Sequence, residues 1–187
     1  MVWLVVGTLV LVLPGTWALK RAKRELASRR RLGTRTVLLA FVAYAGHALV
    51  TTLAALQNIW PLAVDRIVAG SAGVVTLSVG GILYLTGRSA FGSFRRTWGL
   101  DCGRLIQDGV YRYSRHPQTL GSVLVLLGAA LAGRSAVALI LAGVLAVAAA
   151  IWLPIEERFL ERQFGEEYRQ YRARTARFAG WPSRGLE

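Results

Sequence analysis

Cysteine and methionine are almost absent from this chain of 187 residues, which has one of each. The single cysteine, Cys102, excludes an intramolecular disulfide and any metal site built from a cysteine cluster. Nothing in the sequence around Cys102 indicates a nucleophile. We therefore predict neither a metal centre nor thiol chemistry.

Acidic residues are also few, since ten Asp and Glu stand against 23 Lys and Arg, for a formal net charge of +13. Such an excess would suit a nucleic-acid-binding protein if it covered a whole surface. Instead, 21 of the 23 basic residues fall in three blocks, 20–35, 88–115 and 158–184. The chain between the blocks is almost uncharged, which is typical of a membrane protein and argues against nucleic acid as a partner.

Long apolar runs are what the sequence has in abundance. Hydrophobic residues make up 54% of the chain, and its mean hydropathy is +0.43. The runs lack the polar stripe that a helix of a soluble bundle carries. We expect about five transmembrane helices, at residues 2–19, 36–60, 67–87, 118–132 and 135–154. A helix needs about 20 residues to cross a bilayer. The second, third and fifth runs are long enough for this, the first is nearly so, and the fourth is marginal.

The predicted fold is therefore an all-α, polytopic membrane protein with a single domain over residues 1–187. The last two spans are joined by only Gly133, Arg134 and Ser135, which indicates a helical hairpin. The sequence EERFLERQFGEEYRQYRARTARF then alternates charges, with apolar residues at helical spacing, which predicts an amphipathic cytoplasmic helix able to cap a cavity. The expected parts are three spans (1–87), an interfacial loop (88–117), the hairpin (118–155) and the amphipathic helix (156–178).

The basic blocks also predict the orientation, because Lys and Arg in short loops stay on the cytoplasmic side. We expect the N-terminus outside and the C-terminus in the cytoplasm. Residues 2–19 lack a preceding basic segment, so they are predicted to be a retained span and not a cleaved signal.

Two features inside the spans have structural explanations. His47 lies in the middle of the second span, where an ionisable group is costly and often functional; we expect a neutral imidazole hydrogen-bonded inside the bundle. Ala72, Thr76 and Gly80 repeat a small residue every four positions, with Gly73 and Gly81 beside them. This pattern predicts close packing against another membrane helix.

The segment GVYRYSRHPQTLG, residues 109–121, gathers aromatic and basic side chains at the edge of the fourth span. It has two interpretations: an anchor at the membrane interface, or one wall of a ligand site. Pro117 suits the first position of a helix, and the free N–H groups of that helix start, with Arg115 and His116, would form an anion site.

The hairpin returns Glu156 and Glu157 to the same side of the membrane as His116. These carboxylates either complement a helix dipole, or Glu156 faces His116 and contacts a ligand.

This C-terminal half, roughly residues 99–178, resembles the isoprenylcysteine carboxyl methyltransferase and phospholipid methyltransferase superfamily of integral-membrane enzymes. The resemblance rests on GVYRYSRHPQTLG, on the glutamate pair about 40 residues later, and on the F-G-x-x-Y-x-x-Y pattern after it. It implies S-adenosylmethionine as cofactor and methyl transfer to a hydrophobic or amphipathic acceptor (a lipid, a thiol or an isoprenylcysteine-like carboxylate). The implied cofactor contacts are Gly103, Arg104, Leu105, Ile106, Tyr111, Arg115, His116, Pro117, Gln118, Thr119 and Glu156.

Two positions depart from the family pattern. Thr119 stands where these enzymes usually have tyrosine, so an aromatic wall of the cofactor pocket is missing or comes from another side chain. Trp152 stands where the isoprenylcysteine enzymes have an arginine that contacts the substrate carboxylate, which argues against that acceptor. On the acceptor side the resemblance implies Trp152 and Glu157, and it names no catalytic residue.

Two other functions fit parts of the sequence. The steroid and sterol reductases have a similar R-H-P element, so an NADPH-dependent membrane reductase is one alternative, although this chain is short for it. The other is a non-enzymatic membrane module on the same scaffold.

Overall fold

The computed structural model describes residues 1–29, 32–93, 95, 100 and 103–181. Phe94, Trp98 and Cys102, which fall within the predicted interfacial loop 88–117, lie outside the described residues. No strand occurs in the described part of the chain, so the predicted all-α class is confirmed. Its helices are α1 (Val2–Arg29), α2 (Thr34–Leu56), α3 (Arg66–Ser89), the short 3-10 helix η1 (Gly109–Arg112), α5 (Pro117–Ala132), α6 (Ala136–Phe164) and α7 (Glu166–Arg174).

Within the part of the chain that the structure describes, four helices, α1, α2, α3 and α6, are long and apolar enough to cross a bilayer. The fifth predicted span, α5, is apolar but has only 16 residues, about 24 Å at 1.5 Å per residue against a hydrocarbon core of about 30 Å. The protein is an integral, multi-pass membrane protein. The short length of α5 agrees with the sequence, from which the fourth run was expected to be only marginally long enough to span.

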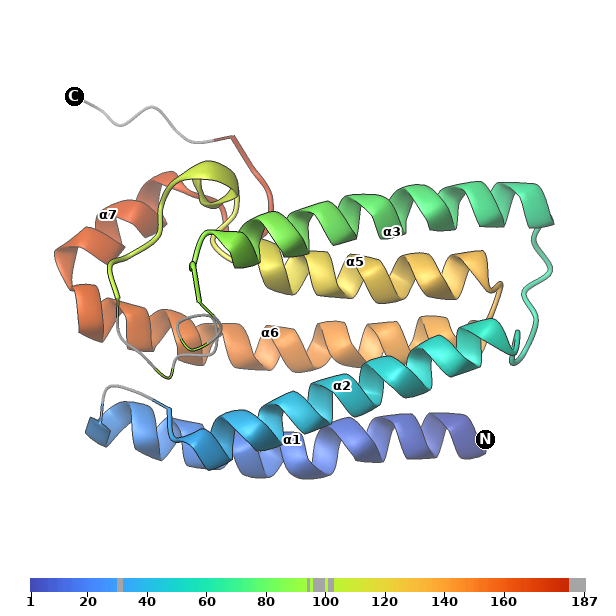
Figure 1. Ribbon diagram of the computed structural model, residues 1–187, viewed down its shortest axis with the longest axis horizontal. Helices are drawn as coiled ribbons and strands as arrows, with labels where there is room; N and C mark the ends of the chain where they lie inside the picture. Colours follow the sequence, from blue (N-terminus) through green and yellow to red (C-terminus); the bar gives the residue numbers. More distant parts are fainter. Residues whose placement is uncertain (30–31, 94, 96–99, 101–102, 182–187) are drawn as a thin grey trace.

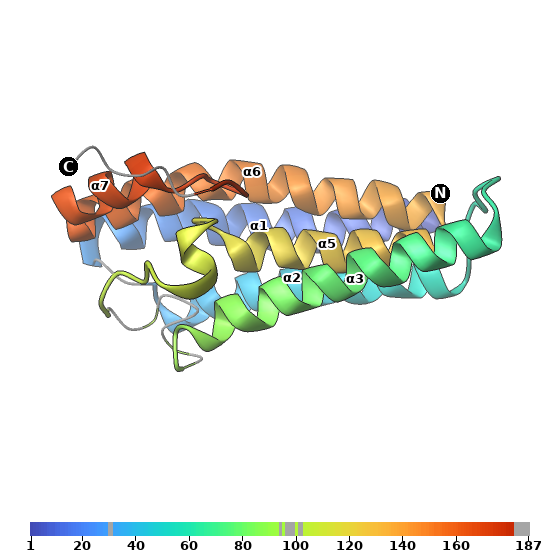
Figure 2. The same ribbon diagram turned by 90° about the horizontal axis from the view of Figure 1, so that it is seen from above.

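The long helices lie side by side along one axis and form two groups (Figures 1 and 2). Helix α3 packs along α5, and α1 packs along α2; α6 joins the groups through contacts with α1, α2 and α5. The chain reverses at each connection, so the α5–α6 turn and the N-terminus lie at one end (Figure 1). The other end carries α7 and the segment 103–116. The basic blocks therefore meet at this second end.

Small residues allow α3 and α5 to approach closely, as the sequence predicted for Gly73 and Gly80. A Cβ on Gly80 would come within 2.8 Å of the Gly121 carbonyl oxygen, and one on Gly73 within 2.4 Å of the Ala132 nitrogen. Two other residues of the predicted pattern do not take part, because Ala72 is exposed and a Cβ on Gly81 would meet nothing within 4 Å.

Helix α6 is longer than the predicted span, and this corrects two expectations. It runs through Pro154 without interruption to Phe164, so Glu156 and Glu157 lie inside it and not at a helix start. A proline is tolerated in a membrane helix because neighbouring groups compensate for its missing N–H. The helix expected at 156–178 is divided at Gly165, whose φ of 56° ends α6, and only α7 follows as a separate helix.

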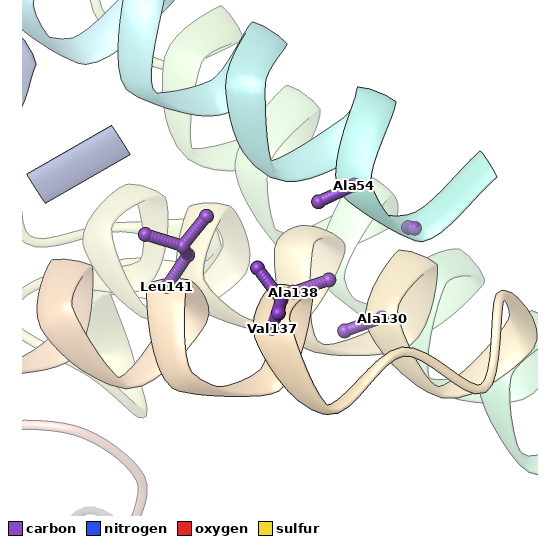
Figure 3. Packing of buried hydrophobic residues seen from close by; sticks show 6 residues of the cluster. Ala54, Ala130, Val137, Ala138 and Leu141 are labelled. Carbon is purple, nitrogen blue, oxygen red and sulfur yellow. The ribbon is translucent and has the colours of Figure 1, made fainter. Parts of the chain in front are cut away.

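The apolar core between α2, α5 and α6 fixes the end opposite the basic blocks (Figure 3). Its members are small or branched and leave almost no accessible surface, so the helices pack at short range. They are Ala54, Ala55, Ala130, Val137, Ala138 and Leu141.

His47 joins three helices at the middle of the bundle. It is fully buried; its Nδ1 lies 2.9 Å from the carbonyl oxygen of Gly7 in α1, and its Nε2 lies 3.0 Å from that of Leu141 in α6. The expected hydrogen bonding inside the bundle is confirmed. Because a carbonyl oxygen only accepts, the two contacts are made in turn by the two neutral tautomers, or together by an imidazolium.

We expect His47→Leu to lower the free energy of unfolding by about 1 kcal/mol, because leucine fills the space but donates no hydrogen bond between helices. Thermal unfolding of the purified protein in detergent measures the change. Thr52→Val is the matched control, since the Thr52 hydroxyl bonds only within its own helix, to Ala48 O at 2.8 Å. Equal unfolding midpoints for the two variants would contradict the bridging role.

Candidate functional site

A cavity of about 620 Å³ opens at the end of the bundle where the basic blocks meet. Its wall draws on α1, α2, α3, α5, α6, α7 and the segment 103–116, so residues from distant parts of the sequence meet there. Its volume lies in the range of small-molecule sites. Among its lining residues are eleven of the thirteen predicted site residues: Gly103, Arg104, Leu105, Ile106, Tyr111, Arg115, His116, Gln118, Thr119, Trp152 and Glu156.

The other two predicted site residues lie behind the wall. Pro117 is the buried first residue of α5, as predicted, and sets the start of that helix. Glu157 has a side chain only 6% exposed, and its oxygens contact Arg115, His116 and Arg177. A buried carboxylate with three cationic or polar partners organises its neighbours and leaves no free oxygen for a ligand.

Arg115 brings a positive charge to the cavity. Its side chain is 10% exposed, and its Nη1 lies 3.2 Å from Glu157 Oε1. Neither Nη1 nor Nε, however, has a hydrogen-bond partner among the residues that the structure describes. Buried guanidinium N–H groups without partners carry a desolvation cost, which an anionic or carbonyl group of a ligand would offset.

His116 stands between the two glutamates, as the hairpin predicted. Its Nε2 is 3.1 Å from Glu157 Oε1, and its Nδ1 is 3.8 Å from Glu156 Oε2. The imidazole is 3% exposed, and the backbone N–H of His116 donates to Ser114 Oγ at 3.2 Å. The hydrogen bond to Glu157 therefore fixes the ring at the start of α5, and Glu156 lies on the other side of the ring.

Glu156 is the accessible member of the glutamate pair. Its side chain is 38% exposed and lines the cavity, whereas that of Glu157 is 6% exposed. One turn before it, the indole Nε1–H of Trp152 donates to Glu156 Oε2 at 3.2 Å. This bond orients the carboxylate, which can still accept hydrogen bonds from a hydroxyl or an ammonium group of a ligand.

A hydrogen-bond network holds Tyr111 in the wall. Gln118 Nε2 donates to the Tyr111 hydroxyl at 3.0 Å, and the Tyr171 hydroxyl donates to the Tyr111 carbonyl oxygen at 2.8 Å. Gln118 Nε2 also donates to Gly87 O at the end of α3. Helices α3, α5 and α7 are thus tied to one another through the segment 103–116.

Tyr168 adds a second polar group to the cavity wall. It is fully buried, and its hydroxyl lies close to the Arg115 side chain but makes no hydrogen bond of regular geometry with the described residues. Burial raises its pKa to about 12, with a further increase from the Glu157 charge that Arg115 partly offsets. The hydroxyl therefore remains protonated at neutral pH and can donate to a ligand.

The aromatic wall that Thr119 cannot provide comes from other elements. Phe91 lines the cavity and packs edge-on against Tyr111, with ring centroids 5.8 Å apart. Both tyrosines of the F-G-x-x-Y-x-x-Y pattern, Tyr168 and Tyr171, line the cavity. The spacing of this pattern could therefore have identified them as site residues. The other aromatic side chains in the wall are Tyr44, Tyr84, Trp152, Phe159, Phe164, Tyr168 and Tyr171.

The N-terminal helices form an apolar part of the wall that sequence reasoning did not identify. Residues of α1 and α2 that face the cavity have the same chemistry as those that face lipid, so the sequence holds no signal to separate them. Most are aliphatic or alanine: Leu11, Val12, Ala18, Leu19, Ala22, Leu26, Val37, Ala40 and Ala43.

Comparison with known proteins assigns the chain to one family. The sequence model of one family, described as phospholipid methyltransferase, matches residues 68–167, which include nearly all of α3, all of α5 and α6 and most of the polar residues of the cavity wall. No significant match occurs among curated proteins or among solved structures. The matched region spans more than half of the 187 residues, so the chain belongs to the phospholipid methyltransferase family.

Proposed function

We propose that the protein binds S-adenosylmethionine in this cavity and transfers its methyl group to an amphipathic acceptor at the cytoplasmic face of the membrane. Membership in a methyltransferase family supports the reaction class. The observation that carries the choice of cofactor is the presence of opposite charges in one largely apolar cavity. Arg115 offers unpartnered N–H groups, and Glu156 offers an accessible carboxylate.

These groups suit the two ends of an amino acid. The guanidinium of Arg115 and the hydroxyl of Tyr168 would donate to the carboxylate of the methionine part, and Glu156 would accept from its ammonium group or from a ribose hydroxyl. The aromatic side chains would enclose the adenine. When bound, S-adenosylmethionine supplies a methyl group on a positively charged sulfur.

The protein's own contribution would be alignment and exclusion of water. Helix α7 and the segment 103–116 cover the cavity, and a closed site holds two reactants in a fixed orientation, which supplies much of the acceleration in group transfer. The aliphatic surface of α1 and α2 would receive the apolar part of the acceptor. A lipid amine or another hydrophobic nucleophile fits such a wall.

The basic blocks support the cytoplasmic location. They lie at the end of the bundle that holds the cavity, and the tendency of Lys and Arg in short loops to stay in the cytoplasm favours a cytoplasmic location for this end. A cysteine introduced at exposed Ser28 would then react with an impermeant maleimide only after the membrane is opened. Labelling of intact cells would contradict this orientation.

Calorimetry on detergent-purified protein tests the cofactor. We expect S-adenosylhomocysteine to bind and NADPH not to bind, and we expect Glu156→Ala to weaken the binding of S-adenosylhomocysteine about tenfold through loss of a charge-assisted hydrogen bond. Binding of NADPH alone would favour the reductase, and binding of neither compound would favour the non-enzymatic module.

A second experiment tests methyl transfer. Incubation with methyl-labelled S-adenosylmethionine and a membrane lipid extract should give a labelled lipid heavier by one methylene.

A further inference from the structure

The chain beyond the family match returns to the site after α7. Residues 175–181, here called the C-terminal strap, run beside residues 113–115. The backbone N–H of Arg115 donates to Ala176 O at 3.0 Å, and that of Gly180 donates to Tyr113 O at 3.1 Å. The strap is thereby fixed to the segment that precedes α5.

This attachment carries the guanidinium of Arg177 to Glu157. Arg177 Nε donates to Glu157 Oε1 at 3.0 Å, and Nη2 donates to Oε2 at 2.6 Å. Such a two-point contact matches the shape of a carboxylate and is the strongest form of this ion pair. The hydrogen bond to Glu157 also raises the pKa of Arg177, so the pair stays charged.

The pairing has a consequence for Arg115, which lies against the same carboxylate. Glu157 Oε1 already accepts from Arg177 Nε and lies 3.1 Å from His116 Nε2. Although Arg115 Nη1 is 3.2 Å from this oxygen, it forms no hydrogen bond with it. The two arginines therefore face the same carboxylate oxygen, and of the two only Arg177 donates a hydrogen bond to it.

We infer that Arg177 is a positioning residue that keeps the guanidinium of Arg115 available to an anionic group of the ligand. By donating hydrogen bonds to Glu157 from outside the cavity, it keeps Arg115, which already lies 3.2 Å from that carboxylate, from turning its unpartnered N–H groups onto the same oxygen. The inference rests on the proposed function, in which the anionic group is the carboxylate of the cofactor's methionine part. It assigns a role at the site to a residue outside the region that matches the family.

Two ligands separate this role from general support of the fold. S-adenosylhomocysteine has the amino-acid carboxylate, whereas 5′-methylthioadenosine keeps the adenosine and the thioether but lacks the amino-acid group. In the full-length protein we expect Arg177→Ala to weaken S-adenosylhomocysteine about 10-fold or more, the range of a lost charge-assisted hydrogen bond, and to change 5′-methylthioadenosine less than about twofold. Calorimetry measures both affinities on the same preparation.

A second substitution tests the route through Glu157. In an Arg177→Ala background, Glu157→Gln removes the charge that would draw Arg115 away, so we expect it to restore most of the affinity for S-adenosylhomocysteine. Arg172→Ala is the control, because Arg172 makes a comparable ion pair with Glu161 on the outer surface, at 3.0 Å.

The outcomes are distinct. A parallel fall in the affinity for both ligands, or an unchanged affinity for both, overturns the inference while leaving the proposed function in place. Failure of the Glu157→Gln rescue overturns the competition between the arginines. If the wild-type protein binds no S-adenosylhomocysteine, the proposed function itself fails.

Discussion

Replacement of Arg115 by alanine is expected to lower the affinity for S-adenosylhomocysteine by about 100-fold. The reason is that Arg115 supplies the unpartnered, buried N–H groups of the cavity, and a hydrogen bond between charged groups in such a place is worth up to about 3 kcal/mol. Calorimetry in detergent checks the value. The affinity of the Arg115→Lys variant should fall between those of the wild type and Arg115→Ala, because lysine keeps the charge but lacks the planar, forked guanidinium group.

The fold should survive this change. Glu157 keeps its contacts with Arg177 and His116 when Arg115 is absent, so the buried carboxylate is not left alone. Arg112→Ala is the matched control, since Arg112 lies three residues earlier on the same segment and is exposed. An Arg115→Ala variant that binds the ligand as the Arg112→Ala variant does would show that the carboxylate is held elsewhere.

The pairing of His116 with Glu156 could be predicted because it depends on chain reversal alone. A three-residue turn between two apolar helices returns the end of the second to the start of the first, and the structure places the two side chains 3.8 Å apart. The identity of Pro117 as the first residue of α5 followed from backbone chemistry in the same way. Local rules and a short connection were sufficient for these features.

The extent of α6 could not be predicted in this way. Proline removes one backbone hydrogen bond, and whether a helix ends there depends on the neighbours that compensate for it. In this protein the helix continues past Pro154 and carries Glu157 to a buried position beside the C-terminal strap. The division between the two glutamates, one open to the cavity and one engaged behind it, is a consequence of tertiary packing.

Arg177 had no signal in the sequence for a related reason. It is one of 23 basic residues, and it lies after the last helix in a block that topology alone explains. Its contact with Glu157 depends on hydrogen bonds between residues about 60 positions apart, such as that from Arg115 N to Ala176 O. A role that arises from such pairings becomes visible only in three dimensions.

The second large effect is expected at the contact between α3 and α5. A Cβ on Gly128 would lie 2.4 Å from the backbone nitrogen of Leu77 and 2.7 Å from the carbonyl oxygen of Gly73. Because these are backbone atoms, no side chain can move aside, and the helices must separate. We expect Gly128→Ala to lower the free energy of unfolding by about 2 kcal/mol, although alanine is the better helix former by about 1 kcal/mol.

Thermal unfolding in detergent measures this effect, and Gly81→Ala is its control. The substitution is the same and lies on α3, but the new Cβ would meet nothing within 4 Å, so stability should be unchanged or slightly higher. Separation of α3 from α5 would also stretch the bonds from Gln118 and Tyr111 to Gly87 O, which are already 3.3 and 3.4 Å long. Binding of S-adenosylhomocysteine should therefore weaken along with stability, and a Gly128→Ala variant as stable as Gly81→Ala would contradict the packing that places the cavity wall.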